Sequence, residues 1–151
     1  MQIKSYKTKN RRLSGTRYED VYDKAYALYV KIRRRTKRRP YLRSAYFKKS
    51  KIFLELFWRH LDQKNWRDRA RRMRYLPCAF EIIQFSRLNP ESKENPNDHS
   101  EILHRFYGIT KEGQIFYVQI KEEKKNGRKM VYFRISRNGL KQKRPSATCG
   151  I

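Results

Sequence analysis

Two alternating apolar runs separated by Asn126-Gly127 constrain the fold of this chain more than any other feature. Residues 115–136 read IFYVQIKEEKKNGRKMVYFRIS, with apolar side chains recurring at every second position on both sides of Asn-Gly. An alternation of period two is typical of a β-strand that buries one face. Asn-Gly is the strongest short hairpin signal, because a type I′ turn needs a positive φ at both central residues. The stretch therefore predicts an antiparallel hairpin.

A two-residue turn at Asn126-Gly127 also predicts which side chains share a face. It pairs Lys125 with Arg128 and, further along the strands, Ile120 with Phe133. The apolar side chains then line up across both strands, as a half-buried sheet requires. This core face consists of Phe116, Val118, Ile120, Val131, Phe133 and Ile135. The pairs on the other face are Lys121 with Tyr132, Gln119 with Arg134, and Tyr117 with Ser136.

The strand before the hairpin, EILHRFYGIT over residues 101–110, extends the sheet. Lys111-Glu112-Gly113 suits a three-residue loop that a glycine closes in the left-handed region, which pairs Thr110 with Gln114. In that register the other face gains Arg105 beside Gln119 and Arg134, Tyr107 beside Tyr117 and Ser136, and Leu103 beside Lys121 and Tyr132. A two-residue loop would bring His104 to that face in place of Arg105. We favour the three-residue loop, and the two-residue loop is the alternative.

Helical periodicity covers residues 16–88. The first helix is predicted to begin at a capping box of Thr16 and Glu19 and to end at or before Arg39, because Pro40 follows. Its apolar face is Val21, Ala25, Leu28 and Ile32, beside a stripe of Tyr18, Tyr22, Tyr26 and Tyr29. A second helix is expected over about residues 44–61. A third segment starts at Trp66, and Pro77 kinks or restarts it.

The segment YLPCAFEIIQF, residues 75–85, is apolar nearly all round and predicts the buried helix that backs the sheet. Cys78 is then a small core residue. For Glu81 we expect an exposed position, with a buried catalytic acid as the alternative.

The predicted fold class is α+β, with N-terminal helices followed by an antiparallel sheet packed on a helix. The expected organisation is a disordered basic arm over 1–15, a helical extension over 16–65, an α+β domain over 66–140 and a basic tail over 141–151. Residues 89–100, NPESKENPNDHS, are expected to form a polar loop.

The charge of the chain favours a polyanionic partner. Lys and Arg number 39 against 14 Asp and Glu, a formal net charge of +25, which favours nucleic acid first and an anionic membrane second. The sequence contains no apolar run long enough to span a bilayer and no signal-peptide pattern, so a cytoplasmic location without a membrane partner is expected. The scattered His residues, Cys78 and Cys149 lack the spacing of a metal site, so no metal or cofactor is expected.

Basic side chains concentrate near the end of the first helix, in KIRRRTKRRP. The helix dipole favours one or two cations there, but seven of the nine residues from Lys31 to Arg39 are basic. We therefore predict contact with nucleic acid, the alternative being a solvated face. The candidate nucleic-acid-binding residues are Arg33, Arg34, Arg35, Lys37 and Arg38, with Arg69, Arg72, Tyr107, Gln119 and Tyr132.

Over about residues 66–136, the segment RYLPCAFEIIQFSR…NPNDHSEILHRFYGITKEGQIFYVQIKEE resembles small phage and mobile-element members of the ribonuclease superfamily of barnase, EndoU, colicin nucleases and RelE-type toxins. The resemblance implies a barnase/RelE-like fold. It also implies cleavage of RNA without metal, by attack of a ribose 2′-hydroxyl on the adjacent phosphate. Barnase-type members use a carboxylate and a His, whereas RelE-type members use Arg, Lys and Tyr. The sheet face predicted here is similar to the second kind.

The resemblance gives the sheet face candidate catalytic roles. Arg105 and Arg134 would stabilise charge on the phosphate, Lys121 would hold a flanking phosphate or assist proton transfer, and Tyr117 would stack on a base or orient the 2′-hydroxyl. His104 is the candidate general acid, and Ser136 completes the set.

The leading functional prediction is a metal-independent endoribonuclease of toxin or mobile-element type, acting on tRNA or rRNA. The alternatives are a non-catalytic protein that binds RNA or DNA, and a subunit that docks on a ribonucleoprotein. An acidic inhibitor protein is a further candidate partner.

Overall fold

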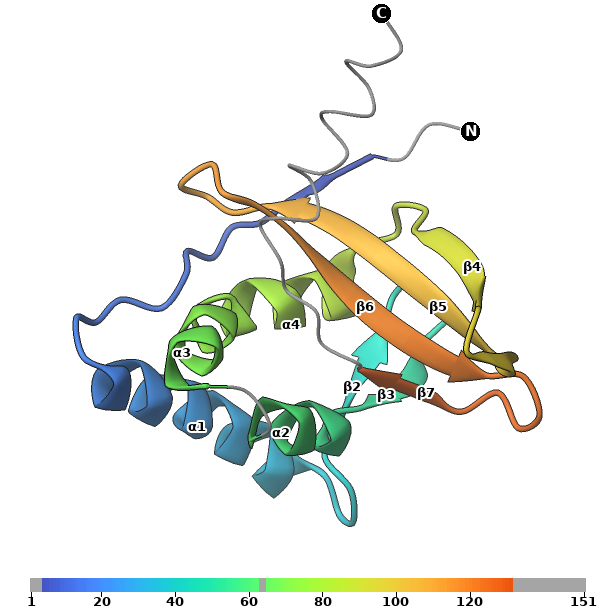
Figure 1. Cartoon of the computed structure of the whole chain (residues 1–151), viewed down its shortest axis with the longest axis horizontal. Coiled ribbons are helices and arrows are strands. Elements are labelled where there is room, and N and C mark those ends of the chain that lie inside the picture. The colour runs from blue at the N-terminus through green and yellow to red at the C-terminus, as the bar shows by residue number, and fades with distance from the viewer. Residues whose placement is uncertain (1–3, 63–64, 132–151) are drawn as a thin grey trace, which may run out of the picture.

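The computed structural model describes residues 4–62 and 65–131 and confirms the α+β class. Its described part contains four helices and a seven-stranded sheet that curls around helix α4 (Figure 1). The helices are α1 (Tyr18–Arg35), α2 (Glu55–Asp62), α3 (Trp66–Arg74) and α4 (Leu76–Phe85). The strands are β1 (Tyr6–Lys7), β2 (Tyr41–Ser44), β3 (Ser50–Phe53), β4 (Glu91–Asn95), β5 (Asp98–Ile109), β6 (Ile115–Glu123) and β7 (Lys129–Val131).

The sheet is mixed, so the prediction of a purely antiparallel sheet is wrong. Its strand order is β1-β5-β6-β7-β3-β2, and β4 also pairs with β5. The pairs β1–β5 and β3–β7 are parallel, while the other pairs are antiparallel. The parallel pairs involve residues 6–7 and 50–53, which pair with strands that lie much later in the sequence. The sequence pattern did not assign either segment to the sheet.

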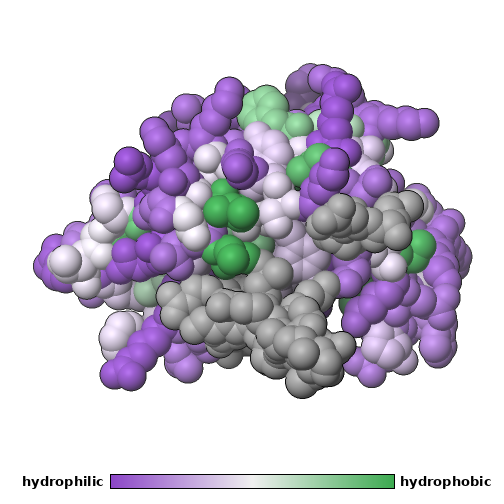
Figure 2. Space-filling model, turned by 90° about the horizontal axis from the view of Figure 1, so that it is seen from above, coloured by the Kyte–Doolittle hydropathy of each residue, from purple (hydrophilic) through white to green (hydrophobic). Residues whose placement is uncertain are grey.

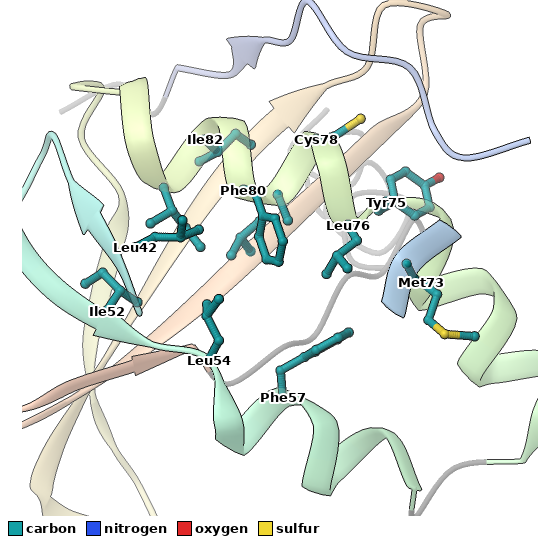
Figure 3. Close-up of a cluster of buried hydrophobic side chains, with 14 of the residues drawn as sticks. Leu42, Ile52, Leu54, Phe57, Met73, Tyr75, Leu76, Cys78, Phe80 and Ile82 are labelled. Carbon is teal, nitrogen blue, oxygen red and sulfur yellow. The ribbon is translucent and has the colours of Figure 1, made fainter. Parts of the chain in front are cut away.

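Helix α4 forms the centre of the core, as its apolar composition predicts. Its side chains at Leu76, Phe80 and Ile82 are almost fully buried. Figure 3 shows them among Leu42 of β2, Ile52 of β3, Phe57 of α2, and Leu54, which lies between β3 and α2. The Cys78 thiol is buried as expected. A new helix starts after Tyr75 with Pro77 in its first turn, where the missing N–H costs no intrahelical hydrogen bond.

Helix α1 covers the core with Val21, Ala25 and Ile32, as its periodicity predicts. The predicted capping box is wrong, because the helix begins one residue later than a Thr16 cap would place it. Arg17 occupies the cap position in an extended conformation and its side chain makes no capping hydrogen bond. The helix ends at Arg35, within the predicted limit.

The predicted second helix over about 44–61 is wrong in its first half. Residues 41–53 form the antiparallel hairpin β2–β3, in which Leu42 pairs with Ile52 and both are buried. The turn uses Lys48 and Lys49, whose φ values are 54° and 70°. Helix α2 starts only at Glu55.

Residues 4–15 lie within the arm expected to be disordered, but they pack on the sheet and on α4. Strand β1 pairs with Gly108 and Ile109 of β5. Glu81, expected to be exposed, is only 6% exposed and accepts hydrogen bonds from the Lys9 N–H (2.8 Å), the Asn10 N–H (3.0 Å) and the Tyr6 hydroxyl (2.9 Å).

These hydrogen bonds set the ionisation of Glu81. Burial acts to raise the pKa of Glu81, but the hydrogen bonds from Lys9, Asn10 and Tyr6 together outweigh burial, and the pKa lies below its ordinary value. Burial first, and then the hydrogen bond to Glu81, raise the pKa of Tyr6 to about 12. Glu81 is therefore a charged anchor for the N-terminal segment.

Residues 89–100, expected to be a polar loop, instead form β4 and the start of β5, which pair antiparallel. Strand β5 thus begins at Asp98, ahead of the predicted strand start. The polar composition misled the prediction because β4 is an edge strand whose side chains are mostly exposed.

The predicted register of β5 and β6 is confirmed. Arg105 pairs with Gln119 and Tyr107 with Tyr117, and the Thr110 N–H donates to the Gln114 carbonyl (2.8 Å). Gly113 has a φ of 91°, the left-handed conformation that the three-residue loop requires.

The predicted register of β6 and β7 is wrong by two residues. Ile120 pairs with Val131 instead of Phe133, and the loop contains four residues, 124–127. Asn126 accepts a hydrogen bond from the Arg128 N–H (2.9 Å) and does not have a positive φ, so Asn-Gly ends the loop instead of forming a type I′ turn. Residues Tyr132, Phe133, Arg134, Ile135 and Ser136 lie outside the described residues.

Candidate nucleic-acid interface

A hollowed basic surface lies where the end of α1 meets the hairpin β2–β3. It consists of two hollows, of about 360 and 550 Å³, that share Arg35 and Tyr41, and we call them together the Tyr41 groove. The first hollow is lined by Ile32, Arg35, Thr36, Tyr41, Leu42, Arg43, Lys49, Gln84 and Phe85. The second is lined by Arg35, Lys37, Arg38, Arg39, Tyr41, Lys51 and Phe53.

The Tyr41 groove is strongly cationic. Its walls carry seven basic side chains, Arg35, Lys37, Arg38, Arg39, Arg43, Lys49 and Lys51, and no carboxylate. Arg39 forms an ion pair with Glu55 at the start of α2. For the other six, no ion pair is found within residues 4–62 and 65–131. Unneutralised cations gathered in a concave surface concentrate the positive field there.

Aromatic rings alternate with these cations. The Lys51 ammonium lies 4.8 Å from the centre of the Tyr41 ring, and the Arg43 guanidinium lies 5.3 Å from it. Arg39 lies 4.3 Å from the centre of the Phe53 ring. Such cation–π pairs hold the long basic side chains in place. Basic side chains interleaved with aromatic ones are typical of surfaces that bind single-stranded nucleic acid.

The structure places three of the predicted basic residues, Arg35, Lys37 and Arg38, in the Tyr41 groove. Arg33 instead lies 6.0 Å from the ring centres of Tyr26 and Tyr29. Arg34, Arg69 and Arg72 do not line the groove.

Sequence reasoning missed Tyr41, Arg43, Lys49, Lys51, Phe53 and Phe85 as groove residues. It missed Lys49, Lys51 and Phe53 because a helix was predicted over about residues 44–61. Neither YLRS nor SKIF alternates apolar and polar residues, so the sequence carried no clear strand signal for the hairpin.

The predicted tyrosine stripe on α1 forms a ladder of rings next to Trp58. Tyr22 and Tyr26 stack with ring centres 5.8 Å apart and planes 6° apart. The guanidinium of Arg69 lies 5.7 Å from the ring centre of Tyr18. The ladder therefore accounts for the position of Arg69 as well as that of Arg33.

The other predicted site, the face of β5 and β6 turned away from α4, brings together Arg105, Tyr107, Tyr117, Gln119 and Lys121 as expected. The Arg105 guanidinium lies 4.4 Å from the Tyr117 ring centre and donates to the Gln119 amide oxygen (3.4 Å). Tyr107, Tyr117 and Gln119, which were predicted to contact RNA, are buried.

This sheet face also contains carboxylates that the predicted rows lacked. Glu91 of β4 accepts a hydrogen bond from the Tyr107 hydroxyl (2.9 Å). Glu101 forms an ion pair with Lys121 (3.2 Å). The charge of Lys121, one of the predicted cations of this face, is therefore neutralised within the protein.

His104 lies on the opposite face of the sheet from Arg105, where it is buried. Its Nδ1 is 2.7 Å from the Ser92 hydroxyl and its Nε2 is 2.7 Å from a Glu122 carboxylate oxygen. The sheet itself separates His104 from Arg105, Tyr117 and Lys121. The predicted use of His104 as a general acid on the same phosphate is therefore wrong.

Within the described residues, no group of three or more His, Cys, Asp or Glu side chains is placed to hold a metal ion. None of the helices over the same residues combines the length and apolarity needed to cross a bilayer. Figure 2 shows hydrophilic side chains over most of one face of the molecule, with a few hydrophobic side chains between them.

Comparisons of the chain with protein-family models, with curated proteins and with solved structures found no match.

Proposed function

We propose that the protein binds nucleic acid, with RNA as its principal ligand, and that the Tyr41 groove is its phosphate-binding site. The observation that carries this proposal is the concentration of seven basic side chains around Tyr41, with no carboxylate on the groove walls. The resemblance of residues 66–136 to RNA-cleaving proteins favours RNA over DNA.

Electrostatics supports a polyanion as the ligand. Each phosphate that a Lys or Arg neutralises releases condensed counterions, so the affinity falls as the salt concentration rises. For single-stranded nucleic acid, each such contact lowers the logarithm of the binding constant by about 0.7 for every tenfold rise in salt concentration. Six groove cations lack an ion-pair partner within the described residues. They can bind phosphates without first breaking an internal ion pair.

The test compares two triple variants that remove the same charge. Lys37→Ala/Lys49→Ala/Lys51→Ala removes three lysines of the groove. Lys93→Ala/Lys111→Ala/Lys125→Ala removes three lysines outside it that are also exposed. Binding to a fluorescent RNA oligomer is measured by anisotropy over a series of salt concentrations. The groove variant should bind at least about 10-fold more weakly, with a salt slope smaller by about two.

The control variant should stay close to the parent protein in both affinity and salt slope. Equal losses in the two variants would mean that RNA responds only to the total charge, and would remove the groove as the site. An unchanged affinity in the groove variant would do the same.

A second candidate function is metal-independent RNA cleavage at the sheet face of β5 and β6, in a barnase/RelE-like manner. The observation that favours it is Arg105, which lies over the Tyr117 ring and is paired across the strands with Glu91. The Arg105 guanidinium would stabilise charge on the phosphate, and a carboxylate would take the proton of the 2′-hydroxyl. We rank this function second because Tyr117 and Gln119, which would have to reach the RNA, are buried.

The cleavage test incubates the full chain with total tRNA or rRNA in excess EDTA. Discrete fragments that disappear in Arg105→Ala would establish the nuclease. Intact RNA under all conditions would eliminate it and leave the binding function.

A further inference from the structure

We infer that the Tyr41 groove takes single-stranded nucleic acid, and that Phe85 is the platform on which one base stacks. This inference rests on the proposed function, because it assigns the ligand class of the same groove.

Phe85 is an exposed hydrophobic side chain within a cationic hollow. It is the last residue of α4, and 65% of its surface is exposed. It lines the first hollow together with Arg35, Arg43 and Lys49. A single exposed apolar side chain is ordinary on a protein surface, but here it shares a concave site with three cationic side chains.

The faces of the other groove rings are already in contact with cations. Arg39 lies over Phe53, while Arg43 and Lys51 lie over Tyr41. Within the described part of the chain, neither a cation nor another ring packs on Phe85. Phe85 is therefore the groove ring that is open to a base, while the cations around Tyr41 are placed to hold the phosphates on either side.

The dimensions of the groove favour a single strand. Hollows of about 360 and 550 Å³ fall in the range of roughly 300–1,000 Å³ that single small ligands fill. A duplex keeps its bases stacked inside and presents phosphates on its outside, so it could reach the basic rim but not stack a base on Phe85. A single strand can turn a base out onto the ring and keep its phosphates on Arg35 and Arg43.

The experiment uses the full chain and three probes of equal length: a single-stranded RNA, the duplex of the same sequence, and an abasic single strand that keeps only the backbone. Affinities are measured by anisotropy for the parent protein, Phe85→Ala and Phe85→Trp. The matched control is Trp66→Ala, which removes an aromatic ring of similar exposure on α3, outside the groove.

Phe85→Ala should weaken binding of the single-stranded RNA by roughly 10-fold or more, the size of effect that loss of one base-stacking ring produces. The salt slope should not change, because stacking releases no counterions. Duplex and abasic strand should bind equally to Phe85→Ala and to the parent protein. Phe85→Trp should bind the single strand at least as tightly as the parent, and Trp66→Ala should bind it equally well.

Two results would overturn the inference in distinguishable ways. If the duplex binds as tightly as the single strand and Phe85→Ala changes neither, the single-strand inference fails while the proposed nucleic-acid-binding function stands. If none of the probes binds, the proposed function fails and the inference fails with it.

Discussion

Glu81→Ala should release the N-terminal segment from α4 and destabilise the protein. The carboxylate accepts two backbone N–H groups, from Lys9 and Asn10, and also the Asn10 amide (2.7 Å) and the Tyr6 hydroxyl. A hydrogen bond to a charged group contributes about 1.5–3 kcal/mol, but such contributions are not additive and the released donors regain water. We expect a loss of about 2–4 kcal/mol, or roughly 5–15 °C in Tm for a chain of 151 residues.

The assay is urea unfolding together with hydrogen exchange of the Thr8 amide, which donates to the Ile109 carbonyl (2.9 Å). Exchange at Thr8 should accelerate in Glu81→Ala more than exchange in β6, because the segment detaches before the core unfolds. The control is Glu19→Ala, an exposed carboxylate on α1. Equal unfolding midpoints and equal Thr8 exchange in the two variants would refute the anchoring role of Glu81.

The same carboxylate should make stability depend on pH. Folding lowers the pKa of Glu81, so its contribution is present above the pKa of the unfolded chain, about 4.3, and is lost as the pH falls through the lower pKa of the folded protein. Glu81→Gln, which cannot ionise, should therefore lose less stability than the parent protein between neutral pH and acid pH. Identical pH profiles would contradict this assignment.

Two further predictions concern the sheet. His104→Ala should lower the free energy of unfolding by about 1–3 kcal/mol, because it removes a buried ring that hydrogen-bonds to Ser92 and to the partly buried Glu122. RNA affinity measured by anisotropy should not change. A large loss of affinity without a loss of stability would contradict this. Gly108→Ala should cost about 1–3 kcal/mol in thermal unfolding, because the added methyl would lie 2.5 Å from Ile82 Cδ1 and 2.9 Å from the Phe116 ring. The control Gly113→Ala should cost only about 1 kcal/mol, because the added methyl meets open space and the only penalty is the φ of 91°. If Gly113→Ala destabilised the protein more than Gly108→Ala, β5 would not pack closely on α4 at Gly108.

Some features that depend only on neighbouring residues were predictable from the sequence, although the capping box and the Asn126-Gly127 turn were not. The loop Lys111-Glu112-Gly113 is local, and its glycine requirement gave the correct pairing of Arg105 with Gln119. The register of the hairpin β6–β7 was harder to predict, because a shift of two residues leaves every side chain on the same face of the sheet. The apolar alternation therefore could not reveal that the Asn126 side chain caps the Arg128 N–H.

Features that depend on distant partners were not predictable. Glu81 looked like an exposed position because the groups that bind it, Lys9 and Asn10, lie 72 and 71 residues away. The Tyr41 groove was half predicted, since the basic run 31–39 is visible in the sequence while its aromatic wall comes from β2, β3 and α4. The row around Arg105 was predicted, but its burial and its pairing with β4 were not.

The parallel pairing of β1 with β5 has a consequence for the order of events during synthesis. Arg12, just after β1, bonds to Glu112, just after β5, and the two are 100 positions apart in sequence. A ribosome therefore releases the segment around Tyr6 long before the strand that receives it exists. Until β5 emerges, that segment is unpaired, and closing so long a loop delays the final step. We expect β1 to dock last, with the hairpins and α4 already assembled beneath it.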